Sequence, residues 1–205
     1  MVLTFSDYAD PLIKFMETLP PEESVILVGH SFGGPVISIA MEMFPEKILA
    51  AVFATAFMPS PTFSYPHIIE KMFADVDLMD YHHRFDNGPN NPPTSAIFGP
   101  KIMSLLLYQL SPPEDVKLVS SLLRFCPVLI HDEIKLTKEK YGSVRKVFIV
   151  CDQDLIIPEK WQRWMIDENP PNEVQVINGA DHMVMFSKPQ ELFTCLQAIA
   201  VSSSF

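Results

Sequence analysis

The chain is organised around Val25-Ile26-Leu27-Val28-Gly29-His30-Ser31-Phe32-Gly33-Gly34. Its first four residues are all apolar, which is typical of a strand buried on both faces. Apolar residues then recur at helical spacing from Val36 to Phe44. A serine between glycines at a strand-to-helix turn predicts a nucleophile elbow, because small neighbours allow the strained turn that lifts the hydroxyl clear of the sheet.

Composition limits the alternatives. A length of 205 residues suits one domain, or one core domain with an inserted subdomain, and 48% hydrophobic residues are enough for a buried core. The chain has 15 Lys and Arg against 25 Asp and Glu, a net charge of −10. This acidic balance argues against nucleic acid or an anionic membrane as the partner.

The cysteines and the first residues bear on location. Cys126, Cys151 and Cys195 are too few and too scattered for a disulfide framework or a zinc site, so a reducing compartment fits best. Residues 1–10 contain acids and no continuous apolar run, so no signal peptide is predicted. Because no apolar stretch reaches membrane-spanning length either, we expect a cytoplasmic protein.

Further elements alternate along the chain. Asp10-Pro11 predicts a helix start, an Asp cap followed by a proline, and Pro20-Pro21 predicts its end. Later strands are expected at 48–57, 147–150 and 174–177, and later helices around 161–165 and over 189–200. Strands that alternate with helices imply an α/β fold, a mostly parallel sheet covered by helices.

The segment 59–140 differs in kind. It holds ten of the nineteen prolines and has short helical patterns over 101–110 and 113–123. We therefore interpret it as an inserted, mainly helical cap rather than sheet. Residues 1–58 and 141–205 would then form the core.

Two loops complete a catalytic arrangement with the elbow. A serine hydroxyl needs an adjacent base that is itself oriented by an acid. In α/β-hydrolases these residues follow in the order Ser, Asp or Glu, His, on loops that meet at the carboxyl edge of the sheet. Asp154 follows the strand at 147–150 and His182 follows the strand at 174–177. We expect Ser31, Asp154 and His182 to form the triad.

Other residues compete for these roles. Asp152 lies closer to its strand end, and spacing alone does not exclude it as the acid. The side chain of Asp181, adjacent to His182, is expected to point elsewhere, and packing under the turn is the favoured role for His30. Adjacent residues such as His82-His83 seldom ligate one ion, and no Cys or carboxylate cluster joins them, so no metal is predicted.

Apolar side chains near the triad have two interpretations. Phe32, Met183, Met185 and Phe186 could line an acyl pocket, and core packing is at least as good an interpretation for the last two. The backbone N–H of Phe32, directly after the nucleophile, is expected to form half of an oxyanion hole.

Together these residues resemble the plant methylesterase and hydroxynitrile lyase family of α/β-hydrolases, over essentially the whole chain. The segments that carry the resemblance are 25–34, 44–48, 56–59, 98–101, 108–123, 148–151, 162–164 and 179–183. The resemblance implies an α/β-hydrolase fold with no cofactor. It also implies the same triad and favours Asp154 over Asp152.

The residue after the histidine separates the two chemistries of that family. Hydroxynitrile lyases have a lysine there that supports the departing cyanide, whereas this chain has Met183. The resemblance therefore favours a serine carboxylesterase that acts on methyl esters of small plant-hormone-like carboxylates, such as salicylate, jasmonate or indole acetate. A hydroxynitrile lyase with the same triad is the alternative.

One departure concerns the start of the chain. Members of the family begin with a strand, a His-Gly loop, a helix and another strand, and no His-Gly pair occurs here. On this comparison the fold is N-terminally truncated and lacks the second oxyanion donor, a loss that costs about 10²–10³ in turnover. A fragment, or a ligand-binding remnant with impaired catalysis, is a further alternative. Residues 25–28 would form a bare sheet edge, from which we expect aggregation or a homo-oligomer.

Overall fold

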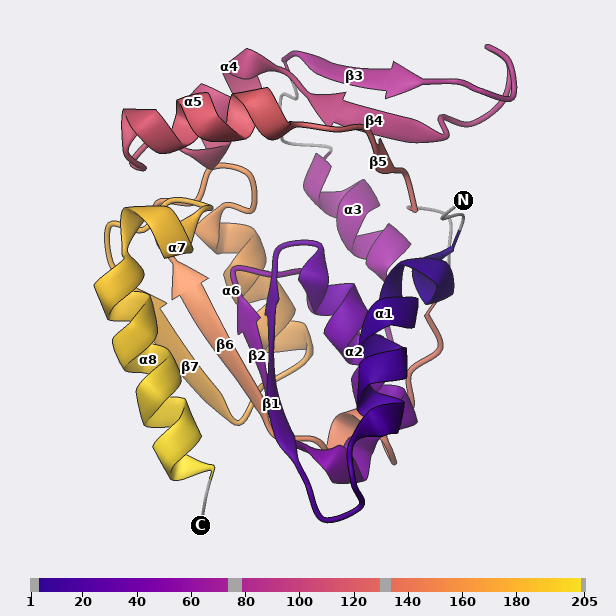
Figure 1. Ribbon diagram of the computed structural model, residues 1–205, viewed down its shortest axis with the longest axis vertical. Helices are drawn as coiled ribbons and strands as arrows, with labels where there is room; N and C mark the ends of the chain where they lie inside the picture. The colour runs from indigo at the N-terminus through magenta and orange to yellow at the C-terminus, as the bar shows by residue number, and fades with distance from the viewer. Residues whose placement is uncertain (1–3, 74–78, 130–133, 204–205) are drawn as a thin grey trace.

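Four parallel strands form the central sheet of the computed structural model, which describes residues 4–73, 79–129 and 134–203. The strands stand in the order β1-β2-β6-β7 (Figure 1). They are β1 (Val25–His30), β2 (Ile48–Ala54), β6 (Lys146–Cys151) and β7 (Glu173–Ile177). The predicted helix-covered parallel sheet is confirmed.

Helices cover both faces of this sheet (Figure 1). Phe53 and Phe148 face a core that also contains Met165, whereas Val52 and Ile149 face a second core that contains Ile199. Because neighbours along a strand point to opposite faces, the central strands are apolar throughout. The helices of the two cores are α1 (Phe5–Thr18), α2 (Gly33–Met43) and α6 (Glu159–Glu168) on one side, and α7 (Val184–Ser187) and α8 (Pro189–Ser202) on the other.

The first helix begins earlier than predicted. A capping box starts α1, in which Asp7 N–H donates to Thr4 Oγ1 at 3.0 Å and Thr4 N–H donates to Asp7 Oδ2 at 3.1 Å. The prediction of a start at Asp10-Pro11 is therefore wrong. Reciprocal capping satisfies two helix-end donors and offsets the hydrogen bond that Pro11 loses inside the helix.

A second layer lies beyond the carboxyl ends of the central strands (Figure 1). Its helices are α3 (Tyr65–Phe73), α4 (Pro100–Ile102), which continues into a π-helical turn over Met103–Leu107, and α5 (Pro113–Leu122). Its strands β3 (Tyr81–Arg84), β4 (Ser95–Phe98) and β5 (Cys126–Pro127) form an antiparallel sheet. The prediction of no sheet in this segment is wrong, because strands of two to four residues are too short to show a period. The cap limits 59–140 stay a prediction.

Strand β1 is an edge of the central sheet as the described residues form it. Leu27 is buried against α2, whereas Val28 on the other face is 48% exposed. An apolar edge strand is a template for pairing with another chain. Self-association through this edge stays a prediction, which size-exclusion chromatography would test. Among the described residues, no helix has the length and apolar character needed to cross a membrane.

Candidate active site

The elbow is a strained turn between β1 and α2. Ser31 has a φ of 52°, in the left-handed region that costs a non-glycine residue free energy. Its carbonyl accepts hydrogen bonds from the N–H groups of Gly34 and Phe57, both at 3.1 Å. A Cβ on Gly34 would lie 1.9 Å from the Phe57 carbonyl oxygen, and one on Gly29 would lie 2.8 Å from the Gly33 oxygen. The two glycines allow the close approach that holds the serine in this conformation.

Asp154 and His182 lie in direct contact. The Nδ1 atom of His182 and Oδ2 of Asp154 are 2.6 Å apart, and both side chains are buried. The other carboxylate oxygen, Oδ1, accepts the N–H groups of Ile156 at 2.8 Å and Ile157 at 2.9 Å. A carboxylate fixed in this way keeps the imidazole proton on Nδ1 and leaves Nε2 free to act as a base.

Thr55 is a partner of this pair that sequence reasoning missed. Its hydroxyl donates to Oδ2 of Asp154, its side chain is buried, and its φ is 39°. The residue stands directly after the end of β2, so it projects from the same sheet edge as Asp154. The available signal was the position of Thr55 in the sequence. It has a hydroxyl group and follows β2, the strand that pairs with β6, and Asp154 follows β6.

Backbone and side-chain bonds join the two loops that carry Asp154 and His182. Asp152 accepts the Gly179 N–H at 2.6 Å, and the Gln153 N–H donates to the Ala180 carbonyl at 3.0 Å. The Asp152 carboxylate therefore fixes the turn before the histidine. Of the two candidate acids, it is Asp154 that contacts the His182 imidazole.

His30 supports the histidine loop from the elbow side. Its Nε2 lies 2.7 Å from the His182 carbonyl oxygen, so Nε2 carries the proton and donates. The two rings lie side by side with centroids 4.7 Å apart. Burial, and then the neighbouring His182, lower the pKa of His30 to about 4.

This pKa predicts a loss of stability in mild acid. The pKa of His30 lies near 6.5 in the unfolded chain and near 4 in the fold, so the unfolded chain binds the proton first as pH falls. The contribution of neutral His30 to the unfolding free energy is fully present above pH 6.5 and is lost progressively as the pH falls towards 4. Between pH 7 and 4.5 we expect His30 to cost about 2 kcal/mol of unfolding free energy. Urea titrations of the wild type and His30→Gln would measure it, and an equal pH dependence in both would contradict the assignment.

The predicted pocket residues have different surroundings. The Phe32 ring stacks on Phe5 with centroids 5.0 Å apart and meets Tyr8 and Tyr65 edge-on. Its backbone precedes Gly33 at the N-terminus of α2, where the helix dipole favours negative charge. Met183 is half-buried against the core on the α2 side of the sheet.

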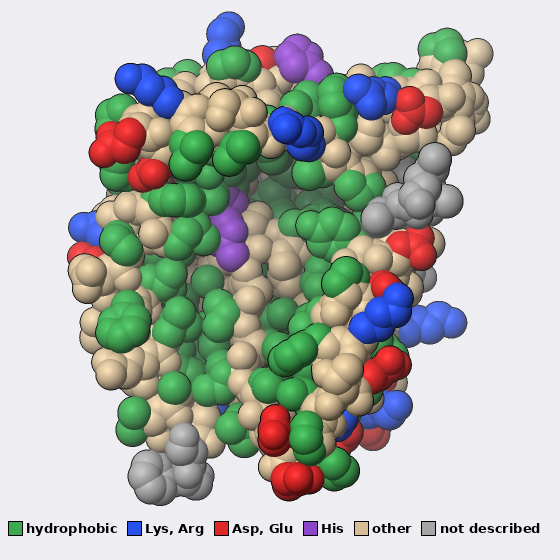
Figure 2. All heavy atoms as spheres, viewed as in Figure 1, with side chains coloured by type: hydrophobic (Ala, Val, Ile, Leu, Met, Phe, Trp, Pro, Cys, Tyr) green, Lys and Arg blue, Asp and Glu red, His purple; other side chains and the backbone are tan. Residues whose placement is uncertain are grey.

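The two remaining apolar candidates contribute to packing. Met185 packs against the core on the α8 side, as its core interpretation predicted. Phe186 meets Tyr108 of the cap segment with ring centroids 5.7 Å apart. Figure 2 shows a hollow beneath the second layer, with apolar side chains around it and a histidine at its edge.

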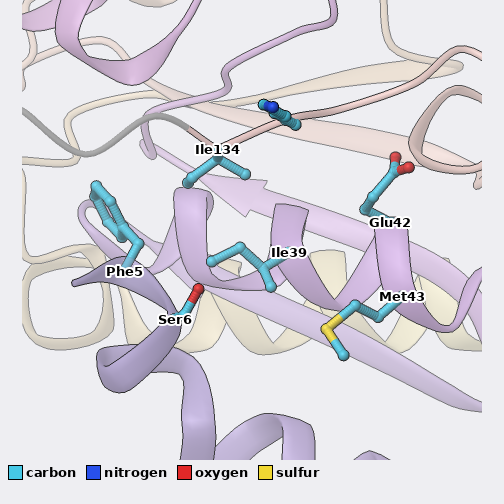
Figure 3. A pocket seen from close by; sticks show the side chains of 7 residues that line it. Phe5, Ser6, Ile39, Glu42, Met43 and Ile134 are labelled. Atoms are coloured by element: carbon cyan, nitrogen blue, oxygen red, sulfur yellow. The ribbon is translucent and has the colours of Figure 1, made fainter.

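Two cavities lie apart from these residues. One of about 280 Å³ is lined by Phe5, Ser6, Ile39, Glu42, Met43, Ile134 and Lys135 (Figure 3). Another of about 390 Å³ includes Tyr141, Lys146 and Asn169 in its lining. Neither is lined by Ser31, Asp154 or His182. Within the described ranges, no group of three His, Cys, Asp or Glu side chains has the arrangement of a metal site, and His82 and His83 lie exposed on β3.

Comparison with known proteins identifies the family. The model of the alpha/beta hydrolase family matches residues 2–194. Methyl jasmonate esterase 1 of Vitis vinifera is 49% identical over 98% of this chain and 79% of its own length. Polyneuridine aldehyde esterase of Rauvolfia serpentina is 40% identical over 97% of this chain and 78% of its own length.

Solved structures agree. Tomato methylketone synthase I in complex with 2-tridecanone superposes with a TM-score of 0.93 at 43% identity, over 99% of this chain and 81% of that one. The crystal structure of polyneuridine aldehyde esterase gives a TM-score of 0.91 at 37% identity, over 97% and 80%. The chain therefore belongs to the alpha/beta hydrolase family and, within it, to the group of the plant methylesterases, which are carboxylic ester hydrolases.

Proposed function

We propose that the protein hydrolyses methyl esters of small plant-hormone-like carboxylates, with Ser31 as nucleophile, His182 as base and Asp154 as the orienting acid. The observation that carries the proposal is the buried 2.6 Å contact between His182 Nδ1 and Asp154 Oδ2, which is joined to the strained Ser31 elbow by His30, whose Nε2 lies 2.7 Å from the His182 carbonyl oxygen. This arrangement matches the roles that ester hydrolysis requires.

The reaction would run in two steps. Ser31 Oγ attacks the ester carbonyl carbon while its proton passes to His182 Nε2, and the Phe32 N–H stabilises the oxyanion. Collapse of the tetrahedral intermediate breaks the bond to the methoxy oxygen, and methanol leaves with the proton from His182. Water then attacks the acyl-enzyme with His182 as base, which releases the carboxylic acid and restores the Ser31 hydroxyl.

The substrate class rests on the relatives and on the second layer. A relative 49% identical to this chain bears the name methyl jasmonate esterase 1. The apolar hollow of Figure 2 suits the hydrocarbon body of such an ester. We therefore place a jasmonate-type ester first, and salicylate- and indole acetate-type esters after it.

Met183 favours ester hydrolysis over cyanohydrin cleavage. Departing cyanide needs a positive charge next to the base, which a thioether does not carry. The Met183 backbone N–H donates to Asp181 Oδ1 at 3.0 Å, so this residue is held in the histidine loop. Cyanide release from a cyanohydrin would be the result that favours the lyase.

A fluorophosphonate probe tests the proposal directly. The probe should label the purified chain, and labelling should vanish in Ser31→Ala, because only an activated serine reacts. Methanol release from methyl jasmonate, methyl salicylate and methyl indole acetate would then rank the substrates. If the folded chain stays unlabelled while it binds these esters equally well as wild type and as Ser31→Ala, it is a binding protein and the proposal fails.

A further inference from the structure

The carboxylate of Asp181 connects the second layer to the histidine loop. Its Oδ2 accepts the N–H of Leu110 and the hydroxyl of Ser111, both at 2.9 Å. Its Oδ1 accepts the N–H of Met183 at 3.0 Å, on the far side of His182. One side chain therefore binds the turn at 110–111 and the peptide that follows the proposed base.

This carboxylate is held by neutral donors in a buried position. Asp181 is 0% exposed, and a buried charge is costly unless strong hydrogen bonds compensate it. Its two oxygens accept from different segments, because Oδ2 faces the turn at 110–111 and Oδ1 faces the histidine loop. In Asp181→Asn the NH₂ group, which donates, would replace one of the two oxygens. It would then face either the donors of the turn or the Met183 N–H, and the hydrogen bonds on that side would be lost.

The same turn also reaches the acid loop. Gln109 Nε2 donates to the Gln153 carbonyl at 2.6 Å, one residue before Asp154. Tyr108 contacts Phe186 just beyond the histidine loop. Residues 108–111, which we name the docking turn, thus touch both loops whose side chains form the contact between His182 and Asp154.

We propose that Asp181 is a positioning residue, which sets the His182 imidazole against Asp154 when the docking turn is seated. His30 Nε2 donates to the His182 carbonyl, and Asp181 accepts the Met183 N–H, so both polar groups of the single peptide that follows the imidazole-bearing residue are fixed. A displacement of a base by about 1 Å costs about 10²-fold in rate, so loss of the Asp181 carboxylate should have a large effect on the rate. The effect on rate depends on the proposed function, whereas the effect on geometry does not.

Asp181→Asn tests this role, with Asp80→Asn as the matched control. Asp80 also accepts two backbone N–H groups, those of Lys101 and Ile102, within the second layer and away from His182. Proton NMR would follow the downfield resonance of the proton between His182 Nδ1 and Asp154, assigned by its loss in His182→Ala. We expect Asp181→Asn to broaden or shift this resonance and to slow fluorophosphonate labelling about 100-fold. Asp80→Asn should change neither.

A milder variant covers a failure of Asp181→Asn to fold. Ser111→Ala removes one of the three hydrogen bonds and should shift the same resonance less, with labelling slowed about fivefold. If Asp181→Asn or Ser111→Ala only lowers the melting temperature, with resonance and labelling rate unchanged, the inference is overturned. If the wild type is not labelled at all, the proposed function fails, and the NMR signal alone decides the role of Asp181.

Discussion

Asp154→Asn should lower kcat for methyl ester hydrolysis about 10⁴-fold with little change in KM. The carboxylate accepts from His182 Nδ1 and from the Thr55 hydroxyl on one oxygen, and from two backbone N–H groups on the other. An asparagine keeps its carbonyl on the side of the backbone donors and turns its amide group towards the imidazole. The imidazole then carries its proton on Nε2, where a base has to be free.

Asp152→Asn is the control for this experiment. It removes a charge two residues away and keeps an oxygen that can accept the Gly179 N–H. We expect kcat to fall less than about tenfold, because the imidazole tautomer is unchanged. Steady-state rates of methanol release would measure both variants. Equal losses in the two would contradict the assignment of Asp154 as the orienting acid.

Gly34→Ala should destabilise the fold by about 3 kcal/mol or abolish folding. The new Cβ would lie 1.9 Å from the Phe57 carbonyl oxygen and 3.2 Å from the Ala56 side chain. The Phe57 carbonyl is a backbone group, so it cannot rotate away from the new Cβ as a flexible side chain could. The segment after β2 would have to leave the elbow and break the bond from the Phe57 N–H to the Ser31 carbonyl.

Gly33→Ala is its neighbouring control. A Cβ at Gly33 meets nothing within 4 Å, and the residue starts α2, where alanine is a better helix former. We expect its unfolding free energy to stay within about 1 kcal/mol of wild type. Urea unfolding followed by circular dichroism would compare the two variants. A Gly34→Ala protein as stable as Gly33→Ala would contradict the close approach of the backbones.

Local patterns were enough to predict the frame of the molecule. The apolar run before Ser31 and the helical spacing after it predicted β1 and α2, since both depend on periodicity within a few residues. The start of α1 was predicted wrongly because the Asp10-Pro11 signal outweighed the capping pair of Thr4 and Asp7, which lies closer to the chain start.

The site was predictable only in part. Chain order pointed to Asp154 and His182, and the structure brings them into contact, while their catalytic roles stay a proposal. Thr55 was missed because its contact with Asp154 joins residues 99 positions apart. The bonds from the docking turn to Asp181 span about 70 positions, and no spacing rule reaches that far.

The bonds that join the two loops bear on how this enzyme can be redesigned. Asp152 bonds to Gly179, Gln153 to Ala180, and Asp154 to His182, so the contacts follow chain order along both segments, with Asp181 passed over in the second. An insertion or deletion in either segment would put all the later steps out of register. The two segments should therefore be grafted together as one cassette.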